Sequence, residues 1–238
     1  MSRRTTMICL MLTLASACSS GPEVSDAAFD NLMDIDVCDP RSARFTTDID
    51  NPFFPLPVGY RIVLEGGGWF SDLLVRITVL DETRTVAGVE TRVVEEYEAE
   101  DGRVLEISKN YFAQTQDGTV CYFGEEVDIY DGDGKVVSNA GAWLADGQTN
   151  VPGIFMPASP EVGHAFQQEI APGIAEDKAA IVERGVMTEV PAGTFTDTLT
   201  IVDRNPLDGD QGAKVYARDV GLIIDGPSEL TTVSSPES

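Results

Sequence analysis

A single histidine, His164, limits the nucleophilic mechanisms available to this chain of 238 residues. Ser-His-Asp triads and Cys-His pairs both move protons through an imidazole, so either mechanism would depend on this one residue. The sequence also has no Gly-x-Ser-x-Gly motif, which presents the nucleophile in many hydrolases. We therefore predict no catalytic residues of these classes.

Carboxylates are far more abundant, with 40 Asp and Glu residues in the chain. Two carboxylates at a suitable separation can hydrolyse a glycoside. With so many acids a pair occurs at almost any spacing, so a carboxylate-dependent hydrolase is only the least favoured alternative. In an extended strand Glu96, Glu98 and Glu100 share one face, which predicts an acidic stripe on a solvated sheet.

Calcium is the best-motivated metal, because Asp128, Asp131 and Asp133 lie in a glycine-rich turn and calcium prefers oxygen ligands. The EF-hand pattern is not met. With Gly134 at the sixth loop position, Ile129 falls at the first and Ala140 at the twelfth, where acids are required. We expect ordinary hairpin turns and no cofactor, with calcium at the three aspartates as the alternative.

The four cysteines of the chain include Cys38 and Cys121, an even pair in a chain with an export signal. In an oxidising compartment such a pair predicts one disulfide, and two separate buried thiols are the alternative. One histidine and two cysteines cannot readily complete a tetrahedral zinc site.

The first 18 residues have the layout of an export signal. Arg3 and Arg4 precede an apolar run at 7–14, and small residues lead to Cys18. This ending resembles a bacterial lipobox. The resemblance implies a signal peptide at 1–17, a lipid on Cys18, a tether at 18–25 and anchoring to the cell envelope, at the outer membrane or cell surface. A plain secretory signal cleaved after Ala17 is the alternative.

The net charge of the chain limits the classes of molecule that it can bind. Without the two arginines of the signal, 14 basic residues face 40 acidic ones, a net charge of −26. Nucleic acid binding needs Lys and Arg to displace counterions, so we expect no nucleic acid partner. The expected partners are the membrane, through the lipid, and an unidentified protein or hydrophobic ligand.

The elements that must position these groups are short strands. Runs such as 60–64, 73–80, 89–97, 104–113 and 194–202 are rich in β-branched and aromatic residues, and Asp-Gly pairs between runs indicate hairpins. One short helix is expected at 26–35, within a lead-in at 26–51. We predict an all-β domain at 52–225, an antiparallel barrel or sandwich of about ten strands, followed by a flexible tail at 226–238.

The domain shows an internal repeat. Val58-Gly59-Tyr60 returns as Val162-Gly163-His164, and Lys109-Asn110-Tyr111 returns as Lys214-Val215-Tyr216, at offsets of 104 and 105 residues. The halves would span 52–125 and 157–225. If so, Gly88 and Gly193 lie in equivalent turns, Tyr111 and Tyr216 at equivalent strand positions, and 176–184 is extended rather than helical. His164 then packs at a strand entry, as Tyr60 does.

The second half also contains Val190-Pro191-Ala192-Gly193-Thr194-Phe195, with Tyr216-Ala217 and Gly221-Leu222-Ile223 further on. This pattern resembles one found in uncharacterised bacterial exported proteins and lipoproteins. The resemblance implies a curved antiparallel sheet of the half-barrel type. It supplies no catalytic residues.

Together these features predict a non-enzymatic binding or structural module of the bacterial envelope. A half-barrel that carries a lipid or another hydrophobic ligand is the main alternative. Its concave face would be lined by some of the aromatic residues, with Trp69 and Trp143 in loops as candidates.

Overall fold

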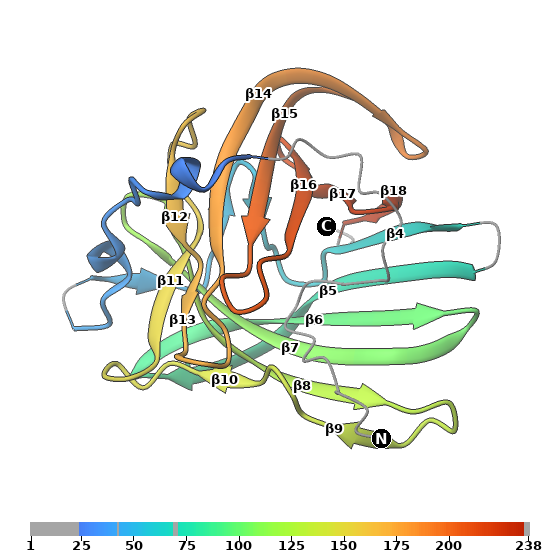
Figure 1. The fold of residues 1–238 in the computed structure, drawn as a ribbon, viewed down its shortest axis with the longest axis horizontal. Coiled ribbons are helices and arrows are strands. Elements are labelled where there is room, and N and C mark those ends of the chain that lie inside the picture. The colour runs from blue at the N-terminus through green and yellow to red at the C-terminus, as the bar shows by residue number, and fades with distance from the viewer. Residues whose placement is uncertain (1–23, 42, 69–70, 236–238) are drawn as a thin grey trace.

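The computed structural model describes residues 24–41, 43–68 and 71–235. The regular secondary structure of the described residues is almost all antiparallel strand, and one large sheet curls into a nearly closed barrel (Figure 1). The predicted all-β class is confirmed. The predicted signal peptide, Cys18, Trp69 and residues 236–238 lie outside the described residues. No helix of the described segments is long and apolar enough to cross a membrane.

The element bounds are as follows. Two 3-10 turns precede the barrel: η1 (Asp26–Phe29) and η2 (Ile35–Cys38). The strands up to the middle of the chain are β1 (Phe45–Thr46), β2 (Asp50–Asn51), β3 (Phe54–Pro55), β4 (Arg61–Gly68), β5 (Ser71–Val86), β6 (Val89–Glu100), β7 (Arg103–Thr115), β8 (Val120–Tyr130) and β9 (Val136–Ser138). The remaining strands are β10 (Trp143–Leu144), β11 (Val151–Met156), β12 (Ala165–Gln167), β13 (Glu169–Ile170), β14 (Lys178–Val190), β15 (Gly193–Arg204), β16 (Gln211–Ala217), β17 (Gly221–Asp225) and β18 (Ser228–Ser234).

Strands β4 to β8 form the first meander, in which each strand pairs with the next. Tight turns set its register. Asp101 and Gly102 both have positive φ (51° and 73°), and Glu100 pairs with Arg103, so two residues connect β6 to β7. Positive φ at both central residues matches the twist of a hairpin, which explains the Asp-Gly pair here.

Strands β12, β14, β15, β16 and β17 form a second meander with the same order and direction. β18 then pairs with β4 and joins the two meanders into one sheet. The residues that lead into β4 and β12, the first strands of the two meanders, form matching backbone hydrogen bonds. Gly59 N–H donates to Val79 O and Gly163 N–H donates to Ile181 O, each at 2.9 Å. The segment after Asp177 is extended, as the repeat predicts.

The repeat differs from prediction in its register. Ala87 and Gly88 make the β5–β6 turn, whereas the β14–β15 turn consists of the two residues before Gly193, because Val190 pairs with Gly193 itself. Tyr111 and Tyr216 each lie on the fourth strand of a meander. Tyr216 faces the barrel interior, whereas Tyr111 alternates with inward-facing neighbours and points to the other face. The predicted equivalence of the two tyrosines is therefore wrong, since a shift of one residue reverses the face of a strand.

The lead-in is not the single helix predicted for 26–35. Only the 3-10 turns η1 and η2 form, and Met33 N–H between them donates to Ala165 O on β12. A helix of ten residues is marginal on its own, so pairing with a strand edge and burial of Phe29 decide the conformation.

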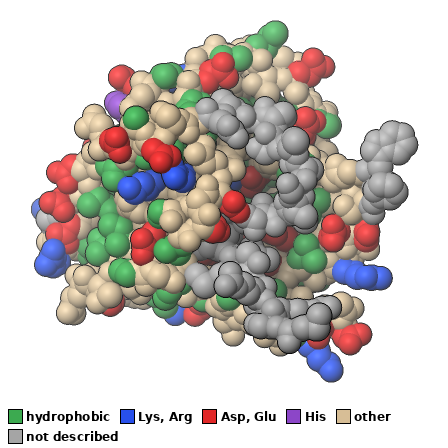
Figure 2. Space-filling model, viewed as in Figure 1, with side chains coloured by type: hydrophobic (Ala, Val, Ile, Leu, Met, Phe, Trp, Pro, Cys, Tyr) green, Lys and Arg blue, Asp and Glu red, His purple; other side chains and the backbone are tan. Residues whose placement is uncertain are grey.

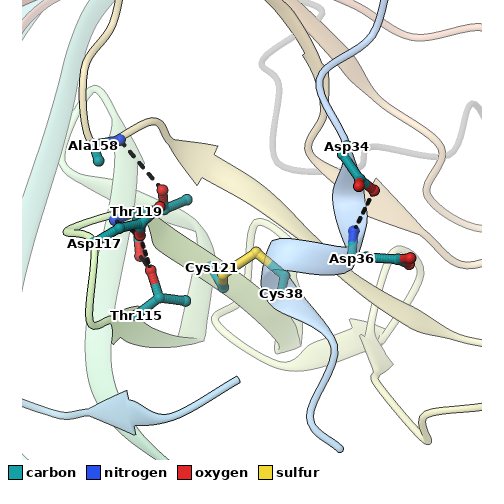
Figure 3. Close-up of a disulfide and its surroundings, with 8 residues drawn as sticks. All are labelled: Asp34, Asp36, Cys38, Thr115, Asp117, Thr119, Cys121 and Ala158. Atoms are coloured by element: carbon teal, nitrogen blue, oxygen red, sulfur yellow. Dashed lines mark hydrogen bonds between the residues drawn. A yellow bond between two sulfur atoms is a disulfide. The ribbon is translucent and has the colours of Figure 1, made fainter. Parts of the chain in front are cut away.

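A disulfide joins η2 to β8, with Cα atoms of Cys38 and Cys121 5.7 Å apart (Figure 3). Both cysteines are fully buried in the main hydrophobic core. The predicted pairing is confirmed. It fixes the lead-in to the first meander.

Candidate functional site

A cavity lies inside the barrel where the interior faces of the two meanders meet. Its volume is about 50 Å³, several times the roughly 10–15 Å³ that one water requires. The lining residues come from β3 to β7, β11, β16, β17 and the loops beside them. They are mostly apolar: Phe54, Pro55, Leu56, Tyr60, Ile62, Ile77, Val79, Val94, Glu96, Asn110, Phe112, Phe155, Lys214, Tyr216, Val220, Gly221, Leu222 and Asp225.

Aromatic rings form one wall of this cavity. Phe54, Phe112 and Phe155 contact one another with ring centroids 4.6 to 5.2 Å apart. The short hairpin of β2 and β3 positions Phe54. The side chain of Gln114 accepts the backbone N–H groups of Asp50 and Asn51 at 3.0 Å, which holds this hairpin against β7.

Charged side chains form another part of the lining. Lys214 Nζ lies 3.5 Å from Asp203 Oδ2 and 3.9 Å from Asp225 Oδ2. Lys214 and Asp225 are cross-strand partners on β16 and β17, and Asp203 lies on the adjacent strand β15. These nearby carboxylates hold the pKa of Lys214 well above its usual value despite burial. Lys214 therefore carries a positive charge that is already paired.

Glu96 adds a third carboxylate, from the first meander. It lines the cavity together with Lys214 and Asp225. Burial raises its pKa to about 7, and the nearby Asp225 charge adds to the shift. Burial likewise raises the pKa of Asp203 to about 7. This region has more carboxylates than its one lysine can neutralise.

The acidic face of β6 continues into the barrel. Glu98 lies directly opposite Glu106 on β7, and both side chains are buried. Burial raises the pKa of Glu106 to about 7 and that of Glu98 to about 10, with neighbouring carboxylates contributing. Like charges facing each other destabilise a sheet, so a proton must remain on this pair near neutral pH. The predicted solvated stripe is wrong, because the face that carries Glu96 and Glu98 is the interior one.

A second buried acidic group lies toward β8 and β13. Trp143 Nε1 donates to Glu169 Oε2 at 2.9 Å. Burial raises the pKa of Glu169 and of Glu125 well above the usual range, and a hydrogen bond with Asp177 adds to the shift of Glu169. Trp143, expected in a loop, is a buried residue on β10 that orients this acid.

The three aspartates of the calcium prediction lie at the far end of β8. Asp131 Oδ1 accepts the N–H groups of Asp133 and Lys135, so it caps the predicted hairpin turn. Asp128 Oδ1 accepts a hydrogen bond from the Asn139 side chain. In the described parts of the chain, no group of three or more His, Cys, Asp and Glu is arranged to hold a metal. Calcium binding by these aspartates stays a prediction.

His164 lies at the entry to β12, away from the cavity lining. Its backbone carbonyl accepts Ile181 N–H at 2.9 Å, and its ring lies 4.0 Å from the Glu161 carboxylate. This is the strand-entry position that the repeat predicts.

The sequence reading missed the charged group of Asp203, Lys214 and Asp225. The alternation of residues along β15 could have indicated this charged group. Leu199, Ile201 and Asp203 alternate along β15, so an aspartate takes the third inward position after two buried apolar residues. Buried charges of this kind need partners, which the next two strands supply.

Comparisons with known proteins give little further information. No protein-family model matches the chain, and no curated protein matches its sequence. One solved structure, described as a "putative lipoprotein" from Parabacteroides distasonis ATCC 8503, aligns with 77% of this chain and 99% of its own at 14% identity. Its TM-score is 0.37, so no conclusion about this chain depends on it.

Proposed function

We propose that this chain is a lipid-anchored, non-enzymatic binding protein of the bacterial envelope, and that the barrel interior is its binding site. The observation that carries the proposal is the cavity between the meanders, with an apolar wall and a charged part. Ligand sites combine mostly apolar linings with a few placed polar groups in this way.

Contacts within the barrel hold the walls of this cavity in place. Phe54 is held by its hairpin, and Tyr60 donates its hydroxyl to Val220 O at 2.9 Å across the gap between the two meanders. Both residues line the cavity. A carboxylate hydrolase is less well supported, because the opposed Glu98 and Glu106 are both buried rather than placed at an open cleft.

The position of the lead-in supports attachment through Cys18. Val24 exchanges backbone hydrogen bonds with the Gln211 side chain, and Asp26 forms an ion pair with Arg204. Five residues separate Cys18 from Val24. At about 3.5 Å per residue this distance is at most roughly 20 Å, so a lipid on Cys18 would hold the barrel close to the membrane.

Acidic groups are spread over the described part of the face shown in Figure 2. A strongly acidic body does not favour binding of the barrel surface to anionic lipids, which attract Lys and Arg. The covalent lipid would then be the main membrane contact.

Occupancy of the cavity is tested with the full chain in a mild detergent, titrated with xenon or benzene. The readout is the ¹³C methyl signals of isoleucine, because Ile62 and Ile77 line the cavity and Ile154 is buried elsewhere. We expect saturable shifts at Ile62 and Ile77 that Val94→Phe abolishes and the exposed control Val137→Phe does not. Equal shifts at Ile154, or none at all, would contradict the proposal.

A further inference from the structure

We propose that the cavity selects a small amphipathic cation, a primary alkylammonium, whose ammonium group lies beside Glu96 and Asp225 and whose chain contacts the aromatic wall. This inference rests on the proposed function and specifies the ligand class.

The charge balance around the cavity is the first support. Lys214 is the one base of the lining, and Asp203 and Asp225 already lie on either side of it at 3.5 and 3.9 Å. Glu96 brings a further carboxylate to the same region. An anionic ligand would need an unpaired base, whereas a cationic one meets an excess of acid.

Unmet hydrogen-bonding capacity is the second support. Asp203 is 1% exposed, and its Oδ1 has no hydrogen-bond partner among the described residues. Buried carboxylate oxygens normally accept hydrogen bonds. An ammonium has three donors, so it could neutralise Glu96 and Asp225 and leave Lys214 free to bind Asp203 more closely.

The shape of the cavity is the third support, and it limits the size of the ligand. Phe112 and Phe155 face the cavity from the first meander and β11, and Leu222 faces it from β17. Such a wall accepts a short alkyl chain and rejects a second charge. The volume of about 50 Å³ suits a chain of few carbons, so butylammonium is the appropriate probe.

The test compares butylammonium, 1-butanol and butanoate at pH 8, with the isoleucine methyl signals of the full chain in detergent as the readout. We expect butylammonium to bind at least tenfold more tightly than 1-butanol, and butanoate to bind most weakly. The variant Glu96→Gln should remove the preference for the amine while leaving 1-butanol binding within about twofold.

The matched control is Glu95→Gln, because Glu95 neighbours Glu96 on β6 and points to the opposite face, where Lys109 is its cross-strand neighbour on β7. It should keep the full preference. If Glu96→Gln unfolds, Asp225→Asn takes its place with the same expected loss.

The outcomes separate the two proposals. Binding of 1-butanol or butanoate as tight as that of butylammonium overturns the cation inference and leaves cavity binding intact. Binding of none of the three, with no shift from xenon or benzene, overturns both. Equal loss in Glu95→Gln and Glu96→Gln also overturns the cation inference.

Discussion

The two meanders share one backbone plan but contribute different chemistry to the interior. In the first, the inward residues of β6 and β7 include three carboxylates, Glu96, Glu98 and Glu106. In the second, β16 supplies an inward lysine and tyrosine, Lys214 and Tyr216, and the adjacent strands supply Asp203 and Asp225 as partners of the lysine. The comparison shows that the strand order is repeated, whereas the charged site arises where the two halves differ.

The Lys-x-Tyr motif illustrates this difference most clearly. Lys214 and Tyr216 line the cavity. Lys109 instead pairs with Glu82 on the outer face, and Tyr111 contacts Arg84 and Glu126 there. The same three-letter pattern therefore places its basic group inside one meander and outside the other.

The disulfide should have the largest effect on stability, and it stabilises only the first meander directly. Replacing Cys38 and Cys121 with alanine should lower the free energy of unfolding by about 4 kcal/mol, because the bond closes a loop across 83 residues. Urea unfolding of the oxidised, reduced and double-variant proteins measures this. A loss below about 1 kcal/mol would show that the lead-in is held mainly by its other contacts.

The buried carboxylates should make the protein less stable as the pH rises. Glu106 has an ordinary pKa of 4.5 and a folded-state pKa of about 7, so the folded state binds more protons between these values. Stability is then highest below about pH 4.5 and falls until about pH 7. Glu98, with a pKa of about 10, extends a weaker fall to higher pH.

The variant Glu106→Gln should remove part of this fall. Each pKa unit corresponds to about 1.4 kcal/mol, so the gain at pH 8 relative to the wild type is at most about 3.5 kcal/mol. The control is Glu126→Gln on the outer face, where Arg84 lowers the pKa of the carboxyl group. Urea unfolding at pH 5 and pH 8 gives both values, and an unchanged slope in Glu106→Gln would refute the assignment.

Several features of the fold were predictable because residue types or short motifs in the sequence indicate them directly. Asp101-Gly102 specifies its hairpin through positive φ, and an even pair of cysteines in a chain with a predicted export signal predicts the bond between Cys38 and Cys121. The interior site was not predictable in this way. Whether Glu96 faces water or the cavity depends on the closure of the sheet through β18 and β4, which a strand pattern does not encode.

The β5–β6 turn offers a smaller test of the comparison. Gly88 has φ of 83° and open space where a Cβ would lie. Gly88→Ala should therefore cost about 1–2 kcal/mol through backbone strain alone. In the second meander the corresponding position is Ala192, which has no positive φ, so Ala192→Gly should cost under about 1 kcal/mol. Thermal unfolding of the two variants measures the difference, and equal costs would mean that the turns are alike after all.

The smallest expected effect distinguishes the two tyrosines. Tyr111 donates its hydroxyl to Glu126 Oε2 at 2.8 Å and accepts a hydrogen bond from Arg84 at 2.7 Å. Removing this hydroxyl in Tyr111→Phe should cost about 1 kcal/mol, because water can replace bonds to the partly exposed Arg84 and Glu126. The methyl signals of Ile62 and Ile77 should not move, since Tyr111 points away from the cavity. Tyr216→Phe should move them, because Tyr216 lines the cavity. Matching shifts from both variants would show that the two tyrosines share a face and that the one-residue difference in register is wrong.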